Sequence, residues 1–566
     1  MLTTIDLRPE VAGPAAALEP TPVGPSRADR VERWVTLIAP FALFVWVGWR
    51  IAVDAANLPG DALSRMANAS SAVLSRDPHL ESIGFIWSPF PTLWQVPLVN
   101  LGRIWPVLVD RALIAVFVSA FLMTWTVSVL RRWLVDAGVQ RVTRLVLVTA
   151  FVVHPFILLY GANGMSEAGM LCFSVLAARR LALWFETERP IELSRAGIAL
   201  GFGYLTRYEF AATIVAVIAL VAVMAYHRAD GEHRDKLREG ALRASVVGVP
   251  AVFAMVLWTI ISWAIVDEPF AQFSSKYGNS QLVKAGAAGI IASAGSIDGL
   301  PRVVFFLKQL MVVGAIGAVA TVLLVWWGTR GGPRIFSALV VLGAPIGFQL
   351  LTAYSGSSFA WGRYVISVVP LTIMLLGAAS VSIVAAPGAN RRMIPLLICS
   401  LAAVSSLIGL VLTRSGELET GDERAQLAAV PTPYGTGEPY APNSAVTIGS
   451  RIAAGIDALH PRHGEVLTDT AAAFAIVINA DDQRDYVIPA DRDFERINAD
   501  PGIFGIRYIL VPDASSSAYN AVSAERPSLY EDGAGIATLV KEWPGGRQMP
   551  GFRLYELNAD QRVKGN

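Results

Sequence analysis

The stretch IAVDAANLPGDALSR, residues 51–65, closes the first long apolar run of the chain and introduces Asp54, Asp61 and Arg65. The apolar run itself, residues 34–53, has roughly the 20 residues that a helix needs to cross the hydrocarbon core of a bilayer. An apolar run that is followed at once by charge predicts a spanning helix that ends at a membrane boundary. We therefore expect a fold built on spanning helices, with these charges at one membrane surface.

The composition of the whole chain also indicates a membrane protein. Hydrophobic residues make up 54% of the 566 residues, charged residues only 16%, and the mean hydropathy is +0.50. Long uncharged runs separated by short basic loops predict a polytopic α-helical membrane protein with about eleven spans. The predicted spans lie near residues 34–53, 108–130, 144–162, 166–185, 194–207, 209–227, 246–266, 304–327, 335–354, 364–386 and 393–413. The net charge of +1 gives no support for nucleic-acid binding.

The arginines indicate how the chain is oriented. Every second loop between the predicted spans is rich in arginine, and such loops belong on the cytoplasmic side. The N-terminus is then cytoplasmic, and an odd number of spans places the C-terminal segment outside the cell membrane. The predicted parts are a disordered cytoplasmic tail (1–33), a transmembrane domain (34–414) with a long first outer loop (54–107), a linker (415–444) and an extracytoplasmic small α/β domain (445–566).

Two outer loops have unusual composition. The first contains GFIWSPFPTLWQVPLVNLGRIW, in which Pro89, Pro91 and Pro97 would break a spanning helix. Its tryptophans favour the headgroup boundary, so we expect short amphipathic helices on the outer surface. A later loop, about 267–303, is rich in small residues and is expected to be mobile.

The C-terminal segment alternates strand and helix patterns. GEVLTD (464–469), DYVIP, RYILVPD (507–513) and a final pair, ATLVKEWP with GFRLYELN, are typical of strands and a hairpin. SRIAAGIDALH, AAAFAIVIN and DFERINAD are typical of helices. This alternation predicts a small α/β domain. The segment has no G-x-G-x-x-G after a strand, so nothing indicates nucleotide binding.

Charged residues collect at the predicted outer ends of the spans. Charges at membrane depth, or just at its edge, are costly and tend to be functional. They are Asp54, Asp61, Arg65, Glu167, Arg207, Glu209 and Arg363. They are scattered along the sequence but are expected at a similar depth, so one reaction centre at the outer boundary would explain them together.

Each of these residues also has a structural explanation that stays open. Asp54 could be only a boundary residue, and Asp61, which follows Gly60, could lie at a turn or N-cap. Arg65 or Arg363 could extend to lipid headgroups. Glu167 could cap the helix that begins there. Arg207 and Glu209, nearly adjacent at a hairpin tip, could form a structural ion pair.

Histidines, cysteines and strand-end carboxylates give weaker signals. His79, in SRDPHLES, could contact substrate or could simply be solvated. The histidines at 460 and 463 lack the further ligands that a zinc site needs, so no metal site is predicted, and a divalent metal has no support. Cys172 and Cys399 both lie in apolar runs, which favours buried side chains over a disulfide or a metal pair. Asp469 and Asp513 end predicted strands, where α/β sheets often bind ligands.

Four short motifs indicate a family when their order along the chain is considered. GDALSR contains Asp61, WSPFPTLWQVPL follows in the same loop, LTRYE contains Arg207 and Glu209, and WGRYVISVVP contains Arg363 and Tyr364. Over about residues 34–414, their order resembles the GT-C superfamily of membrane glycosyltransferases, particularly the bacterial dolichyl-phosphate-mannose-protein mannosyltransferase-like and RgtA/B/C/D-like group. In that group an acidic residue of the first outer loop, often in a D-E pair, is regarded as the catalytic base. Here Ala62 stands in place of the second acid.

The resemblance implies a reaction. The donor would be a sugar on a polyprenyl phosphate, and the acceptor a glycan, glycolipid or protein hydroxyl. Asp61 would accept the acceptor's proton, Arg207 or Arg363 would stabilise the departing phosphate, and Arg65, His79, Glu167, Glu209 and Tyr364 would complete the substrate site. No cofactor is implied beyond a divalent metal that some relatives use.

Two other classes of function stay open. A transporter or lipid flippase would need ionisable residues near the middle of the membrane and broken helices in matching repeats. A non-catalytic membrane scaffold with an external binding domain would tolerate substitutions in the first outer loop.

Overall fold

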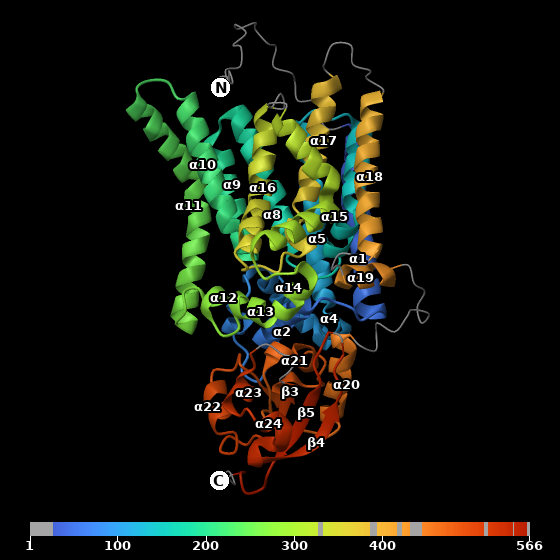
Figure 1. Cartoon of the computed structure of the whole chain (residues 1–566), viewed down its shortest axis with the longest axis vertical. Helices are drawn as coiled ribbons and strands as arrows, with labels where there is room; N and C mark the ends of the chain where they lie inside the picture. Colours follow the sequence, from blue (N-terminus) through green and yellow to red (C-terminus); the bar gives the residue numbers. More distant parts are fainter. Residues whose placement is uncertain are drawn as a thin grey trace.

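The computed structural model describes residues 26–326, 332–384, 393–415, 421–430, 444–513, 519–546 and 548–562. Residues 1–25 of the predicted tail and much of the predicted linker lie outside these ranges. The chain forms a multi-pass bundle of helices with a small α/β domain at one end, which confirms the predicted fold class (Figure 1).

Eight helices within the described residues are long and apolar enough to cross a membrane, and a bent pair could form a ninth span. The eight are α1 with its last turn η1 (Arg27–Asp54), α5 (Leu113–Asp136), α8 (Glu167–Thr187), α10 (Phe210–Arg228), α11 (His233–Val266), α16 (Gly332–Tyr354), η4 (Gly362–Val365) with α17 (Val368–Val384), and α18 (Met393–Ser415). The bent pair joins the segment Ala271–Ala294 to the start of α15 (Gly299–Trp326) at 75°.

The predicted number of about eleven spans is not confirmed, although helices occupy each predicted stretch. The third stretch is divided into α6 (Arg141–Val153) and α7 (Pro155–Tyr160). Pro155 has no backbone N–H to continue α6, so the helix ends before it. The fifth stretch, α9 (Pro190–Thr206), has only 17 residues.

Helix α1 begins earlier than the sequence analysis expected. Ser26 caps it, and its side chain and that of Asp29 form a reciprocal capping box. The helix therefore starts at Arg27 within the predicted disordered tail, and it places Glu32 at the end of the bundle away from the C-terminal domain. The carboxylate of Glu32, 2% exposed, accepts hydrogen bonds from three guanidinium groups: Arg144 at 2.7 Å, Arg141 at 2.9 Å and Arg131 at 3.3 Å.

The bundle buries its centre and exposes apolar side chains at its sides. Helix α8 packs against α5, α9 and α16 and is largely buried. Helix α11, at one edge of the bundle, exposes Val249, Phe253 and Trp263. Exposed apolar side chains of this kind are suited to contact with lipid.

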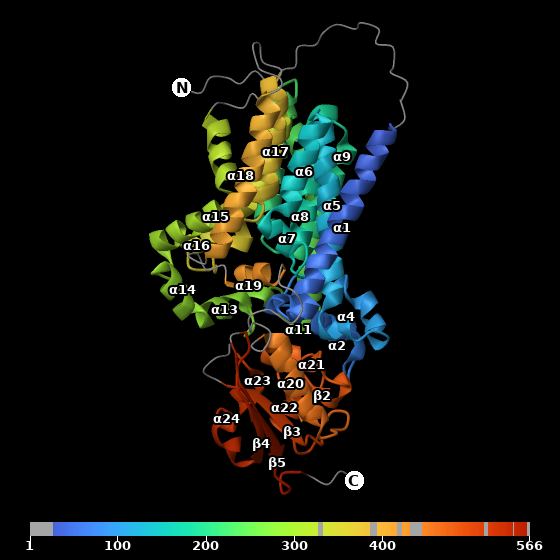
Figure 2. The same cartoon turned by 90° about the vertical axis from the view of Figure 1, so that its right-hand side faces the viewer.

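The first outer loop folds into short helices between the bundle and the C-terminal domain (Figure 2). They are α2 (Gly60–Leu74), η2 (Leu80–Ile83), α3 (Phe90–Leu93), η3 (Val96–Arg103) and α4 (Val107–Asp110). The later loop that was expected to be mobile also contains short helices, namely α12 (Ala271–Ser274), α13 (Asn279–Ala285) and α14 (Ala287–Ala294).

Part of the predicted linker is a helix packed against the bundle. Within α19 (Gly421–Ala429), Glu423 accepts a hydrogen bond from Tyr160 at 2.6 Å, and Gln426 accepts one from Asn163 at 3.2 Å. The segment predicted as a linker therefore includes a short helix with polar partners in the bundle. The Pro, Gly and Thr residues that follow this helix gave no indication of it.

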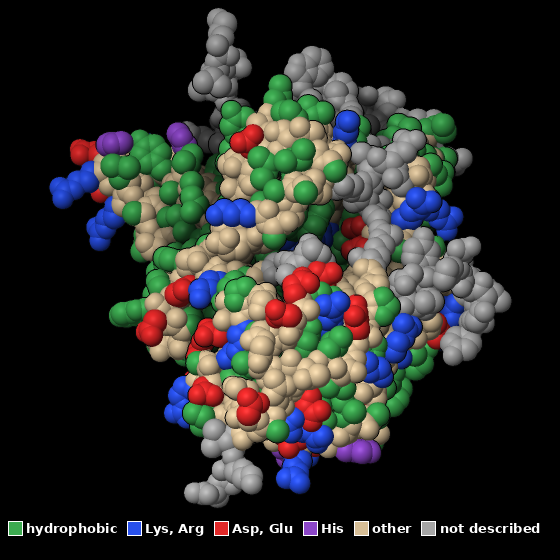
Figure 3. All heavy atoms as spheres, turned by 60° about the horizontal axis from the view of Figure 1, so that its bottom comes forward, with side chains coloured by type: hydrophobic (Ala, Val, Ile, Leu, Met, Phe, Trp, Pro, Cys, Tyr) green, Lys and Arg blue, Asp and Glu red, His purple; other side chains and the backbone are tan. Residues whose placement is uncertain are grey.

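The C-terminal domain has a five-stranded sheet of order β2-β1-β3-β5-β4. Strands β1 (Val466–Leu467), β2 (Tyr486–Val487) and β3 (Tyr508–Pro512) are parallel, while β5 (Phe552–Leu557) pairs antiparallel with β3 and with β4 (Ala537–Trp543). Helices α20 (Ala445–Asp457), α21 (Thr470–Val477) and α22 (Phe494–Ala499) fall where the sequence predicted them, as do the strands. Figure 3 shows acidic and basic side chains interspersed at this end of the molecule.

Helix α2 is held by the C-terminal domain. The hydroxyl of Ser70 donates to Gln483 Oε1 at 2.7 Å in a buried contact. Arg76, just beyond the helix, pairs with Asp491 at 3.1 Å and also with Asp493. The helix that carries Asp61 is thus fixed from the side opposite the bundle.

Candidate active site

A cavity of about 430 Å³ lies where the bundle meets the first outer loop and the α12–α14 segment. It is lined from several parts of the chain that are far apart in sequence. Its charged and aromatic lining is Asp61, Arg65, Trp87, Arg207, Tyr208, Glu209, Phe359, Trp361, Arg363 and Tyr364. The volume falls within the roughly 300–1,000 Å³ that is usual for small-molecule sites.

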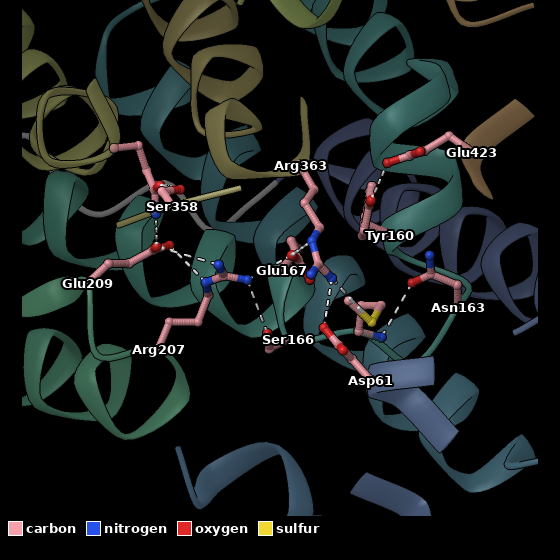
Figure 4. Close-up of polar contacts among 12 residues, drawn as sticks. Asp61, Tyr160, Asn163, Ser166, Glu167, Arg207, Glu209, Ser358, Arg363 and Glu423 are labelled. Atoms are coloured by element: carbon pink, nitrogen blue, oxygen red, sulfur yellow. Dashed lines mark hydrogen bonds and ion pairs between the residues drawn. The ribbon is translucent and has the colours of Figure 1, made fainter. Parts of the chain in front are cut away.

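Asp61 lies in the first turn of α2 and faces the cavity. One carboxylate oxygen, Oδ2, accepts a hydrogen bond from Arg363 at 2.9 Å, across 302 residues of sequence (Figure 4). The other oxygen, Oδ1, accepts no hydrogen bond from the described residues, and the side chain is 27% exposed. Asp61 therefore presents one free oxygen to whatever occupies the cavity.

The neighbouring arginines keep Asp61 ionised. Burial by itself would raise the pKa of its carboxyl group, but Arg363 and then Arg65 stabilise the charged form. As a result, the pKa of Asp61 lies below its ordinary value of 3.8. At neutral pH the group is a carboxylate that is ready to accept a proton.

Arg207 stands between two buried carboxylates. It donates to Glu167 at 2.7 Å and to Glu209 at 2.8 Å, and more weakly to Ser166 at 3.3 Å (Figure 4). Glu209 also accepts from Gln349 at 2.6 Å. Arg207 is therefore held in place by its neighbours. The structural ion pair between Arg207 and Glu209 is present, and the same guanidinium lines the cavity.

Glu167 reaches Arg207 because the chain before α8 turns tightly. Gly164 has a φ of +76°, and a Cβ there would lie 2.7 Å from the side chain of Ala115. Only glycine adopts this backbone conformation and this close approach without strain. The turn places Glu167, fully buried, beside Arg207, so the carboxylate forms an ion pair in addition to opening a helix.

Arg65 differs from the other two arginines because it has no carboxylate partner among the described residues. Its residue surface is 5% exposed, its Nη1 donates to the backbone oxygen of Asp61 at 3.4 Å, and its Nε lacks a hydrogen-bond partner. Its guanidinium lies 4.9 Å from the centre of the Trp87 ring. A buried cation with unused donors is costly, so this position favours an anion that comes from outside the protein.

The remaining predicted residues separate into two groups. Tyr364 lines the cavity and stacks under Arg363 and Arg207, whose guanidinium carbons lie 5.2 and 5.4 Å from its ring centre. His79 does not line the cavity; its ring contacts the backbone oxygen of Asp77 at 2.6 Å and the hydroxyl of Ser82. Asp54 pairs with Arg50, one helical turn away, and is likewise not part of the lining.

Several lining residues were not among the predicted site residues. Trp87 and Trp361 belong to the WSPFP and WGRY motifs, so their position beside quoted motifs was the available signal. Asn279 and Leu282 come from α13, in the loop whose small residues suggested mobility. Nothing in the local sequence of α13 points to the cavity, because its position depends on contacts with distant segments.

The carboxylates and histidines of the C-terminal domain also have defined partners. Among the described residues, His463 lies with Asp482 and Asp485 in a group that could hold a metal ion, a clustering that the sequence analysis did not foresee. Arg484 already donates to Asp482, so a cation there would compete with a guanidinium. Asp469 caps α21 and is buried by protein contacts instead of lying open to a ligand.

Comparison with known proteins gives matches of structure alone. No family model matches the chain, and no curated protein matches it. ArnT from Cupriavidus metallidurans bound to undecaprenyl phosphate is similar with a TM-score of 0.46 and 13% identity, over 94% of this chain and 100% of ArnT. AglB from Archaeoglobus fulgidus, an oligosaccharyltransferase in complex with an inhibitory peptide and a dolichol-phosphate, gives 0.41 and 11%, over 89% of this chain and 71% of AglB.

The arabinofuranosyltransferase AftD from Mycobacteria gives a TM-score of 0.38 and 14% identity, over 93% of this chain and 42% of AftD. ArnT, AglB and AftD are GT-C glycosyltransferases, members of the superfamily that the sequence resembles. With TM-scores below 0.5, these likenesses carry no argument about chemistry. A proposal about the reaction therefore rests on the side chains of this chain.

Proposed function

We propose that the chain is an inverting glycosyltransferase that moves a sugar from a polyprenyl-phosphate donor to an acceptor hydroxyl at the outer face of the cell membrane. The observation that carries this proposal is the cavity in which Asp61 keeps a free carboxylate oxygen while Arg65, which also lines it, has no carboxylate partner among the described residues. A base and an unpaired cation in one cavity are what this reaction requires, because a proton must leave the acceptor while a phosphate departs.

Asp61 acts as the general base in this proposal. The acceptor oxygen attacks the anomeric carbon and forms the new C–O bond, and its proton passes to Oδ1 of Asp61. The bond from the anomeric carbon to the phosphate oxygen breaks, and its electron pair leaves with the phosphate. Attack from the face opposite the phosphate inverts the anomeric centre.

Arg65 binds the donor phosphate in this proposal, in preference to the two arginines that the sequence analysis favoured. Arg207 is engaged by two carboxylates and Arg363 by Asp61, whereas Arg65 has no carboxylate partner in the part of the chain that the structure describes. A guanidinium matches the geometry of phosphate oxygens and keeps its charge at any physiological pH. Arg363 keeps Asp61 ionised and oriented.

The position of the cavity supports a lipid-linked donor. It lies where the bundle meets the short helices of the first outer loop, so a donor held by lipid at that end of the spanning helices would be near the cavity. Helix α1 begins at the opposite end of the bundle from the C-terminal domain (Figure 2). The basic loops predict a cytoplasmic N-terminus, so the cavity and the domain would face outward.

A transfer assay tests this function. The purified full chain is supplied with a panel of polyprenyl-phosphate sugars and candidate glycan, glycolipid and peptide acceptors, and the product's anomeric configuration is determined. We expect release of polyprenyl phosphate with inversion for at least one pair, and its loss in Asp61→Asn. Equal turnover by Asp61→Asn, or a product that retains the donor configuration, would contradict the proposal.

A further inference from the structure

One wall of the cavity, the α12–α14 segment, is connected to the C-terminal domain through Tyr277. The hydroxyl of Tyr277, in the α12–α14 segment, donates to Oδ2 of Asp469 at 2.8 Å. Asp469, the N-cap of α21, follows the first strand of the domain sheet and lies 192 residues further along the chain. Tyr277 lies two residues before Asn279, which begins α13 and lines the cavity.

Asp469 is built to hold this contact. It is 1% exposed, and its two oxygens also accept hydrogen bonds from the backbone N–H of Ala471 at 2.8 Å and of Ala521 at 2.7 Å. A buried carboxylate is stable only when its oxygens are supplied with donors. The tyrosine hydroxyl is the one donor in this set that comes from outside the domain.

The ring of Tyr277 is fixed as well. It meets the ring of Tyr519 edge to face, with centres 4.9 Å apart, and Lys276 lies over the same Tyr519 ring at 5.4 Å. Such aromatic pairs add about 0.5–1.5 kcal/mol beyond the area that they bury. The domain therefore holds Tyr277 by its hydroxyl and by its ring.

The opposite end of α13 is packed against the bundle side of the cavity. A Cβ at Gly286 would lie 2.7 Å from the ring of Phe359, which itself lines the cavity. Between these two ends, Asn279 and Leu282 face the cavity. Helix α13 has only seven residues, so it depends on its two ends for its position.

We propose that Asp469 is a positioning residue of the active site: through Tyr277 it holds α13 against the cavity, so that the C-terminal domain sets the shape of the substrate site. This role rests on the proposed transferase function. It gives the C-terminal domain a part in substrate binding that does not require a ligand of its own.

Tyr277→Phe tests the proposal, because it removes one hydroxyl and keeps the ring. Hydrogen exchange of the full chain in detergent micelles is measured over residues 279–286, together with kcat and KM for the donor. We expect exchange of this segment to accelerate about tenfold and donor KM to rise about tenfold with kcat little changed, as when uniform binding is lost. Asp469→Asn should accelerate exchange in the same segment.

The matched control is Tyr226→Phe. It removes a hydroxyl that contacts His233 at 2.9 Å in the α10–α11 hairpin, and it should leave exchange at 279–286 unchanged. Unchanged exchange in Tyr277→Phe, or equal acceleration in the control, overturns the proposal. Since exchange is measured without substrate, this result is separate from a failure to find transfer in the wild-type chain.

Discussion

The two ends of the bundle each hold a cluster of buried charges, and the clusters differ in how fully they are paired. At the end away from the C-terminal domain, both oxygens of Glu32 are engaged by Arg131, Arg141 and Arg144. At the end beside the C-terminal domain, Asp61 keeps a free oxygen in the cavity that it lines, and Arg65, which lines the same cavity, has no carboxylate partner among the described residues. Buried charge alone does not indicate a functional site. A charged group that lines a cavity and still has an unused hydrogen-bonding atom is a better indication of one.

The sharpest test of this difference exchanges one carboxylate for an amide at each end. Asp61→Asn should lower transfer by about 10²–10⁴-fold, the usual contribution of a general base, and should cost less stability than Glu32→Gln because it breaks one ion pair instead of three. Glu32→Gln should lower stability by on the order of 3 kcal/mol, because three buried guanidinium groups lose their shared charge partner, while kcat of the folded protein persists.

Thermal unfolding and transfer rates of both variants, measured in the same detergent, check this pair of outcomes. A large loss of turnover in Glu32→Gln, or a large loss of stability in Asp61→Asn, would show that the two clusters do not differ in the way described.

A second test compares one arginine from each cluster. Arg65→Gln should raise KM for the donor by about 10- to 100-fold, the effect of losing a charged hydrogen bond to phosphate. Arg131→Gln removes the same group from the Glu32 cluster and should leave donor KM unchanged. Steady-state kinetics over a range of donor concentrations measures both, and an equal KM shift in the two variants would remove Arg65 from the phosphate site.

The smallest predicted effect concerns pH. In the wild-type chain the pKa of Asp61 is lowered, so the base stays ionised, and activity should fall only below the ordinary carboxyl range. Arg363→Gln removes the guanidinium that contributes most to this lowering, so the pKa of Asp61 rises. The acid limb of kcat/KM should then move to higher pH by about one unit. A limb that stays in place would indicate that another group limits the rate in acid.

Local patterns predicted much of the architecture. The C-terminal strands were predicted from short runs rich in β-branched and aromatic residues, because the sequence signal for each strand lies within a few neighbouring residues. The start of α1 was missed, although Ser26 and Asp29 carry a capping signal, because the surrounding composition resembled a tail. Glu32 was assigned to that tail, and its pairing was therefore not foreseen.

The sequence could not predict which of the distant charged residues form ion pairs with one another. The position of Asp61, Arg207 and Arg363 at one depth followed from their place at the ends of spans, and the structure brings them to one cavity. Which arginine lacks a carboxylate partner depends on contacts between residues that are far apart in the sequence, such as the pair of Asp61 with Arg363. His79 was included because it shares a loop with Asp61, but the loop turns its ring toward Asp77 and Ser82 instead.

The contacts that hold α2 have a consequence for biosynthesis. Ser70 and Arg76 find their partners 413 and 415 residues later in the chain, in a domain that the ribosome makes after the spanning helices. Until that domain has been made and has folded, helix α2 lacks these contacts. The protein would thus be inserted in the membrane well before it is competent, and a chain truncated after the last spanning helix would assemble a bundle without a finished site.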